Sequence, residues 1–171
     1  MNIRDAKGYD YEGIKRVQKI TWLATYPDKK HGITREEIEA RFNQPPRRPI
    51  EESKKAIEGD KNSHYWVAEE NDIVVGFCSA LRKDGKDRIG AIYILPEYQG
   101  KGVGKKLIFE GIKWLGGKKD IFIGVASYNN DAIKFYKSSG FINTGEIGSS
   151  PASTLPFGSV IPEIEMIKRA D

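Results

Sequence analysis

The sequence predicts an α/β domain in which a mixed sheet is covered by helices on both faces. Three observations lead to this fold class. Helix-period segments fill residues 10–60, strand-like segments follow one another from His64, and strands then alternate with helices to the end of the chain. The chain has 171 residues, enough for one sizeable core, so we expect a single domain over residues 1–171.

Two helices with recognisable ends are expected near the N-terminus. Asp10 can cap the first, and Pro27 ends it. Its apolar face falls at helical spacing on Ile14, Val17, Ile20 or Thr21, and Ala24. Thr34 is the expected N-cap of the second helix, and Glu37, three residues later, completes the pattern of a capping box.

The middle of the chain changes from helix to strand. Three prolines exclude a helix over residues 43–49, and residues 50–60 predict a short, weakly amphipathic one. Residues 64–81 predict two strands joined by a turn at Asn71 and Asp72. Residues 87–95 predict a third strand, which ends at Pro96.

The last third of the chain alternates between the two types of element. Five apolar residues on one face predict a helix, namely Val103, Leu107, Ile108, Ile112 and Leu115. Residues 120–126 predict a strand, and residues 129–140 a short helix capped by Asn129 or Asn130 and closed by Gly140. Strands are expected at 141–147 and 160–168.

Several classes of function have little support in the composition. The single cysteine, Cys78, lies in an apolar strand, which indicates a buried, inert thiol. The two histidines lack the spacing of metal ligands, so neither a zinc site nor a catalytic triad is indicated. No apolar run approaches the ~20 residues of a membrane helix, and the N-terminus has no signal-peptide core. We therefore expect a cytoplasmic protein that does not enter a membrane.

The positive charge of the chain suits an anionic ligand. The formal net charge is +4 and the isoelectric point is about 9.0, which fits a phosphate-bearing ligand or a nucleic acid equally well. No nucleic-acid motif is recognisable, so nucleic acid is not the expected partner. The lysines gather instead around one glycine-rich turn.

That turn follows a strand and opens a helix, an arrangement that binds phosphates. Gly100, Gly102 and Gly104 let an anion approach the backbone, and the first N–H groups of the helix have no partners within it. The spacing fits neither of two common phosphate motifs. A Walker A loop requires Ser or Thr after its lysine, where this chain has Leu107, and a dinucleotide fingerprint requires glycine where it has Lys105.

Two motifs resemble those of the GCN5-related N-acetyltransferases, the GNAT family. The stretch QGKGVG, residues 99–104, is similar to the family signature Q/R-x-x-G-x-G/A. The stretch NNDAIKFYKSSGF resembles the second motif, N-x-x-A-x-x-x-Y-x-x-x-G-F, with matches at Asn129, Ala132, Tyr136, Gly140 and Phe141. The resemblance covers roughly residues 65–145. It implies a mostly antiparallel central sheet and transfer of an acetyl group from acetyl-CoA to a primary amine, without a metal.

The resemblance also implies roles for individual residues. The pyrophosphate of acetyl-CoA would bind the turn formed by Gln99, Gly100, Lys101, Gly102, Val103, Gly104 and Lys105. The main chain of Ile92, Tyr93 and Ile94 would pair with the pantetheine arm, and the backbone N–H of Ile94 would hold the thioester oxygen. Asn129 and Ala132 would contact the coenzyme from the other side. Tyr136 would donate a proton to the departing thiolate as general acid.

The general base is where this sequence departs from some relatives. Ribosomal-protein alanine acetyltransferases carry a glutamate at the position of Gly124, and the pattern here is closer to that of polyamine acetyltransferases. Four glutamates are candidates that could act through water, namely Glu69, Glu97, Glu163 and Glu165. A chain without a base would be a non-catalytic acyl-CoA sensor, which is the alternative function.

The sequence does not identify the amine that accepts the acetyl group. The family's acceptor site lies between the first helices and the last hairpin, where Trp22, Tyr26 and Phe157 could form an aromatic wall. Glu36, Glu37 and Glu39 are close by in sequence and would suit a polyamine. A protein α-amine, a lysine side chain and an antibiotic are the alternatives, and a second copy of the chain is a further candidate partner.

Overall fold

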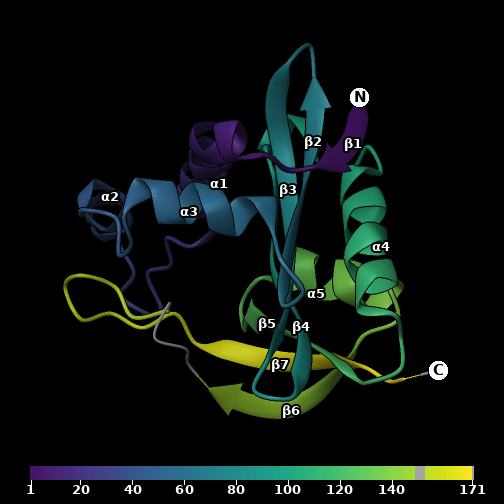
Figure 1. The fold of residues 1–171 in the computed structure, drawn as a ribbon. Helices are drawn as coiled ribbons and strands as arrows, with labels where there is room; N and C mark the ends of the chain where they lie inside the picture. The colour runs from purple at the N-terminus through teal and green to yellow at the C-terminus, as the bar shows by residue number, and fades with distance from the viewer. Residues whose placement is uncertain (149–152, 171) are drawn as a thin grey trace.

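One twisted sheet organises the chain (Figure 1). The computed structural model describes residues 1–148 and 153–170, and in these residues seven strands follow the order β1-β2-β3-β4-β5-β7-β6. The strands are β1 (Asn2–Asp5), β2 (Ser63–Glu70), β3 (Ile73–Lys83), β4 (Lys86–Ile94), β5 (Ile121–Ala126), β6 (Ile142–Gly148) and β7 (Glu163–Lys168). All described neighbours pair antiparallel except β4 and β5, so the predicted mixed, mostly antiparallel sheet is confirmed.

Helices cover the sheet from both sides, as the sequence predicts. The helices are α1 (Tyr11–Thr25), α2 (Arg35–Asn43), α3 (Ile50–Glu58), α4 (Val103–Leu115) and α5 (Asn130–Ser138), with short 3-10 turns η1 (Gly8–Asp10) and η2 (Pro96–Tyr98). Figure 1 shows α1, α2 and α3 on one side of the strands and α4 on the other. Cys78 on β3 is fully buried under α4, and this burial raises the pKa of its thiol, as expected of an inert cysteine.

Local signals place most of these elements correctly. Asn71 and Asp72 both adopt positive φ (50° and 61°) in the β2–β3 turn, and Thr34 Oγ1 accepts a hydrogen bond from Glu37 N at 3.1 Å as an N-cap. The Glu37 side chain does not complete the capping box. Its Oε1 accepts backbone N–H bonds from Phe157 at 2.9 Å and Ser159 at 3.1 Å, so this buried carboxylate ties α2 to the loop before β7.

Two strands differ from the sequence prediction. The sequence does not predict β1, because its four residues include two charges and show no alternation of apolar and polar side chains. The strand forms by pairing with β2. The guanidinium of Arg4 on this strand binds Asp10 at 2.7 Å and also Glu69. β7 begins at Glu163 rather than at residue 160, and Pro162, which lacks an N–H, directly precedes it.

β4 and β5 pair only at one end, and this partial pairing opens the sheet. Their parallel register contains two pairs, Asp87 with Ile121 and Arg88 with Phe122. The β3–β4 register shifts just beyond these pairs, where Gly90 is the extra residue on β4. From there to Ile94, β4 pairs with β3 but not with β5. The carboxyl halves of two central strands therefore border a gap.

Candidate active site

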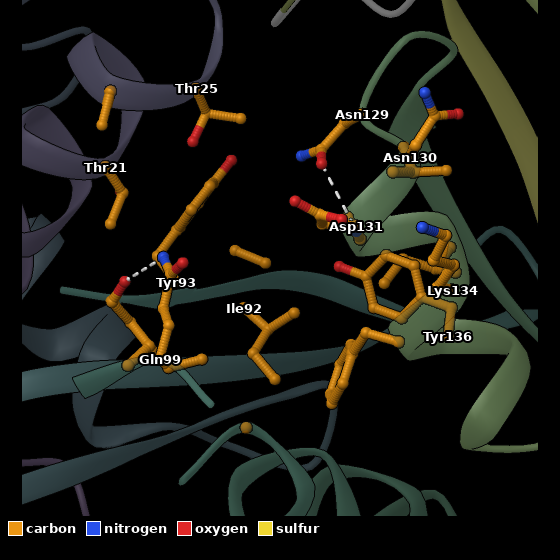
Figure 2. Close-up of a pocket in the computed structure, with 18 of the residues that line it drawn as sticks. Thr21, Thr25, Ile92, Tyr93, Gln99, Asn129, Asn130, Asp131, Lys134 and Tyr136 are labelled. Atoms are coloured by element: carbon orange, nitrogen blue, oxygen red, sulfur yellow. Dashed lines mark hydrogen bonds between the residues drawn. The ribbon is translucent and has the colours of Figure 1, made fainter. Parts of the chain in front are cut away.

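A cleft of about 1170 Å³ occupies the gap between β4 and β5. Figure 2 shows Thr21 and Thr25 of α1 on one side of it and Asn129, Asp131 and Tyr136 on the other, with β4 between them. Elements far apart in sequence thus meet around one space. The cleft is large enough for an extended ligand.

The β4 wall presents backbone groups to this cleft. Leu95 N donates to Val75 O of β3 at 2.9 Å. In an antiparallel ladder alternate residues turn their N–H groups to opposite sides, so Ile94 and Ile92 point theirs away from β3 and toward the gap. The carbonyl oxygen of Ile94 accepts a hydrogen bond from Gln99 Nε2 at 2.9 Å, which leaves its N–H as the group offered to a ligand.

The glycines after β4 have two different physical roles. Gly100 (φ 73°) and Gly102 (φ 80°) adopt the left-handed conformation, and a Cβ at either would meet nothing within 4 Å. Gly102 is the N-cap of α4, whose first N–H groups have no intrahelical acceptor and suit an anion. Gly104 allows close packing instead, because a Cβ there would lie 3.2 Å from the Phe135 ring.

The other predicted residues of the turn lie differently. Lys105 lines the cleft and supplies positive charge beside the start of α4. The Lys101 ammonium lies 5.3 Å from the centroid of the Tyr98 ring, and this residue is not part of the cleft lining. The Val103 side chain is buried in the core, so only its backbone could serve a ligand.

α5 forms the opposite wall. Asn129 Oδ1 accepts a hydrogen bond from Ala132 N at 3.1 Å, which makes Asn129 rather than Asn130 the N-cap. Figure 2 shows the Asn129 amide nitrogen turned toward the cleft, and Ala132 also lines it. Capping by the oxygen therefore leaves the amide N–H₂ available to a ligand.

Tyr136 is buried, yet its hydroxyl reaches the cleft. The residue is 6% exposed, it packs against Phe135 and Phe141, and Figure 2 shows its oxygen pointing toward Ile92. Burial raises its pKa well above the ordinary tyrosine value. Tyr136 is therefore a neutral phenol at any physiological pH.

Aromatic hydroxyls define the end of the cleft near α1. Tyr26 Oη and Tyr93 Oη lie 3.2 Å apart, and burial raises the pKa of both. Tyr128 Oη donates to the carbonyl oxygen of Tyr26 at 2.9 Å, which joins the loop before α5 to the end of α1. His31 stacks on Tyr128 with ring centroids 5.0 Å apart.

The predicted aromatic wall of the acceptor site is only partly present. Tyr26 lines the cleft, but Trp22 is buried behind it, packed edge-on against Tyr26 at 4.8 Å. Phe157 is 70% exposed and lies outside the cleft lining, and Glu37 Oε1 accepts a hydrogen bond from its backbone N–H at 2.9 Å. Residues 149–152 of the last hairpin lie outside the described residues.

The glutamates expected to suit a polyamine do not line the cleft either. Glu37 is buried against the loop before β7, and Glu39 forms an exposed ion pair with Arg35 at 3.2 Å. Glu36 is exposed in the first turn of α2. Their positions remove only the argument that these three glutamates bind a polyamine.

Of the four base candidates, one faces the position of the missing glutamate. Glu163 Oε2 lies 3.4 Å from the point that a Cβ would occupy at Gly124, and Gly124 lines the cleft. Glu165 is paired with Arg88 at 3.1 Å, and Glu69 with Arg4. Glu97 is exposed on η2. A carboxylate from β7 thus lies beside Gly124 of β5, although Glu163 itself is not part of the cleft lining.

Within residues 1–148 and 153–170, no three His, Cys, Asp or Glu side chains are grouped so as to hold a metal ion. No helix in the same residues is long and apolar enough to cross a membrane.

Comparison with known proteins identifies the family. The model of the acetyltransferase (GNAT) family matches residues 20–141. The chain belongs to the GNAT family. It is an N-acetyltransferase, and as a member of this family it uses acetyl-CoA as its cosubstrate. The predicted family, enzyme class and cosubstrate are confirmed.

Named relatives of this GNAT protein differ in acceptor. It is 31% identical over 113 residues to a spermine/spermidine N(1)-acetyltransferase of Bacillus subtilis, covering 57% of this chain and 74% of that protein. It is also 31% identical over 88 residues to the L-amino acid N-acyltransferase MnaT of Escherichia coli, covering 47% of this chain and 51% of that protein.

Solved structures share the fold. The PaiA N-acetyltransferase of Thermoplasma acidophilum, in complex with coenzyme A, has a TM-score of 0.70 at 20% identity and covers 98% of both chains. YncA of Salmonella typhimurium, a structure with acetyl-CoA, has a TM-score of 0.70 at 24% identity and covers 100% of this chain and 94% of its own. The single mixed α/β domain is thus that of other GNAT proteins.

Sequence reasoning missed several of the residues that line the cleft, among them Thr25, Tyr128, Asp131 and Phe135. Two of them had a usable signal. Phe135 follows Ala132 by three residues and Tyr128 precedes Asn129, so helical spacing and proximity to the second motif could have included them. Thr25 carried no comparable signal, because only the packing of α1 brings it to the cleft.

We predict that Gly102→Val weakens coenzyme A binding by at least about 10-fold, which corresponds to 1.4 kcal/mol. A β-branched residue strains the left-handed φ and places methyl groups beside the first N–H groups of α4. Isothermal titration calorimetry measures the affinity. Gly85→Val is the matched control, since Gly85 (φ 76°) is equally open but lies at the other end of β4. Equal affinity in both variants would remove the turn from the binding site.

Proposed function

We propose that this GNAT protein transfers the acetyl group of acetyl-CoA directly to a primary amine. The amine nitrogen attacks the thioester carbon, the carbon–sulfur bond breaks, and one proton leaves the nitrogen while the coenzyme thiolate gains one. One observation carries the proposal: the Ile94 N–H on β4 and the Tyr136 hydroxyl on α5 face the same cleft from different sides. A thioester between them would have one donor for its oxygen and one for its sulfur.

The coenzyme would enter along the walls already described. Its pyrophosphate would accept hydrogen bonds from the N–H groups at the start of α4, with Lys105 adding charge. The pantetheine amides would pair with the outward backbone groups of Ile92 and Ile94. The Asn129 amide would contact the arm from the α5 side. These placements agree with the resemblance in the sequence and leave the α1 end of the cleft for the acceptor.

The buried state of Tyr136 decides how it can assist. Because its pKa is raised, the hydroxyl stays protonated and is always a donor. The same burial opposes a free tyrosinate, and an ordinary thiol has a pKa of about 8.5, below that of the phenol. As general acid, Tyr136 would therefore give its proton to the sulfur only while the tyrosine receives another proton in exchange. Its hydrogen bond to the sulfur would also stabilise the thiolate.

Glu163 is the base that the geometry favours. An ammonium at the acceptor must lose a proton before it can attack, because a lysine-like amine has a pKa of about 10.4. The Glu163 carboxylate beside Gly124 could accept this proton through a water molecule. The sensor alternative rested on the absence of a carboxylate at residue 124, and a base at Glu163 would remove that reason.

The proposal specifies the acceptor only as a primary amine, since one relative is named for spermine and spermidine and another for L-amino acids. Acetylation of a protein N-terminus or lysine is the alternative. A cytoplasmic location and a homodimer stay predictions.

We predict that Tyr136→Phe lowers kcat for acetyl transfer by roughly 10- to 1000-fold, because the ring still packs but the donor to sulfur is gone. Thiol release from acetyl-CoA measures the rate, and calorimetry should show coenzyme affinity changed by no more than a few-fold. Tyr11→Phe is the control, since Tyr11 is equally buried at 6% exposure but lies outside the cleft. A Tyr136→Phe enzyme at full rate would make the tyrosine structural only.

We predict that Glu163→Gln changes the pH profile of kcat/KM for a simple amine. With a base in the site, kcat/KM should reach a plateau below the pKa of the free amine; without one it should rise about tenfold per pH unit until that pKa. Glu165→Gln is the matched control on the same strand, since that carboxylate is held by Arg88. An unchanged plateau in Glu163→Gln would show that a group other than Glu163 accepts the proton of the amine.

A further inference from the structure

Two tyrosines at the α1 end of the cleft have hydroxyls that take no part in the proposed steps of acetyl transfer. Tyr26 directly follows α1 and Tyr93 lies on β4, and their Oη atoms are 3.2 Å apart. Both residues line the cleft. Figure 2 shows Tyr93 on the α1 side of this space, opposite Asn129 and Tyr136. The hydroxyl pair therefore borders the space left for the acceptor.

The position of Tyr93 in β4 relates the pair to the reacting atoms. Tyr93 stands between Ile92 and Ile94, whose N–H groups point toward the gap and are proposed to bind the pantetheine arm and the thioester oxygen. Consecutive Cα atoms are ~3.8 Å apart, so the Tyr93 side chain begins one residue from each of these groups. An amine at the hydroxyl pair would lie in the same part of the cleft as the thioester.

Packing and hydrogen bonds hold both tyrosine rings in place. The Tyr26 N–H donates to Trp22 O at 3.0 Å, and Tyr128 Oη donates to the Tyr26 carbonyl oxygen at 2.9 Å. The Trp22 ring packs against Tyr26 at 4.8 Å and against Tyr93 at 6.5 Å between centroids. Tyr93 also packs against Phe77 at 5.6 Å. The two hydroxyls are therefore preorganised before a ligand arrives.

The chemistry of the pair suits a primary ammonium. Burial raises the pKa of both phenols, so they are neutral at physiological pH. One O–H joins the two oxygens, which leaves lone pairs to accept hydrogen bonds from an ammonium, a group with three N–H donors. Tyr128 also lines this cleft, and aromatic rings attract cations.

The charges around the pair also favour a cation. The residues of α1 in the cleft lining are uncharged, namely Thr21, Ala24 and Thr25, and the lysines of the lining lie on α4 and α5. Two charged residues outside the lining act on Tyr93. After burial, the Glu163 carboxylate raises the pKa of this phenol, and the Arg41 guanidinium lowers it by a smaller effect. Glu163 also raises the pKa of Tyr26.

We propose that the Tyr26 and Tyr93 hydroxyls together bind the ammonium of the acceptor and position its nitrogen for attack on the thioester. This inference rests on the proposed acetyl transfer and assigns the residues that bind the amine in the same site. The ammonium donates hydrogen bonds to both oxygens. Once it has lost one proton to the base, its remaining N–H groups keep these bonds while the nitrogen lone pair faces the carbonyl carbon.

The test removes each hydroxyl and keeps each ring. Tyr26→Phe and Tyr93→Phe should each raise the KM of the amine about 10-fold, as expected for loss of a hydrogen bond to a charged group, while the KM of acetyl-CoA stays within a few-fold. The probe is n-butylamine, because nitrogen is its only polar atom. It is measured as a substrate or, where it is not acetylated, as a competitive inhibitor of whichever of spermidine and L-amino acid amides is acetylated.

Two further variants sharpen the test. Tyr65→Phe is the control, since Tyr65 is a partly buried tyrosine of β2 outside the cleft lining, and it should leave both KM values unchanged. In the double variant of Tyr26 and Tyr93 the KM of the amine should rise by less than the product of the two single effects, because each hydroxyl orients the other. Thermal melting checks that every variant folds, and should Tyr93→Phe not fold, Tyr26→Phe decides.

Several results would overturn the inference. An unchanged KM for n-butylamine in the Phe variants, with acetyl transfer intact, would remove the pair from the amine site and leave the proposed function standing. So would a KM of acetyl-CoA that rises as much as that of the amine, or n-butylamine that neither reacts nor inhibits. Single effects that multiply in the double variant would show that the hydroxyls do not act together. A wild type that binds acetyl-CoA and acetylates no amine would end both the inference and the proposed function.

Discussion

The partial pairing of β4 with β5 is the constraint on which the rest of this structure depends. Two residue pairs hold the strands together at one end, and β4 then continues with β3 alone. A β-strand edge in a protein interior needs partners for its N–H and C=O groups. The same feature that interrupts the sheet therefore creates the surface that we propose binds the coenzyme. Asp87, Arg88 and Gly90 mark the place where this divergence begins.

The elements that follow β4 and β5 complete the site because they start at the open end of the sheet. α4 begins after the glycine turn and directs its free N–H groups toward the gap, and α5 begins at the Asn129 cap. The Gln99 side chain holds the Ile94 carbonyl, so the strand end and the turn are fixed together. Backbone groups therefore provide most of the contacts proposed for the coenzyme, which suits a ligand shared by enzymes with different acceptors.

Burial gives the chemical groups of the cleft their protonation states. Tyr136, Tyr26 and Tyr93 are all held as neutral phenols, since their pKa values are raised mainly by loss of water. They can donate hydrogen bonds without becoming charged. The charged residues of the cleft lining are Lys105 near the start of α4 and Asp131 and Lys134 on α5, and Glu163 lies beside Gly124.

The sequence by itself determined the features that depend on neighbouring residues. The Thr34 and Asn129 caps, the positive-φ glycines at 100 and 102, and the alternation of strands and helices are local, so short motifs predicted them and the family with them. Tertiary structure alone decided which carboxylate meets Gly124, that Trp22 is buried while Phe157 is exposed, and that Glu37 binds a loop. The reason is physical: a side chain's partners across a sheet or between helices depend on register and packing, which join residues that no local pattern relates.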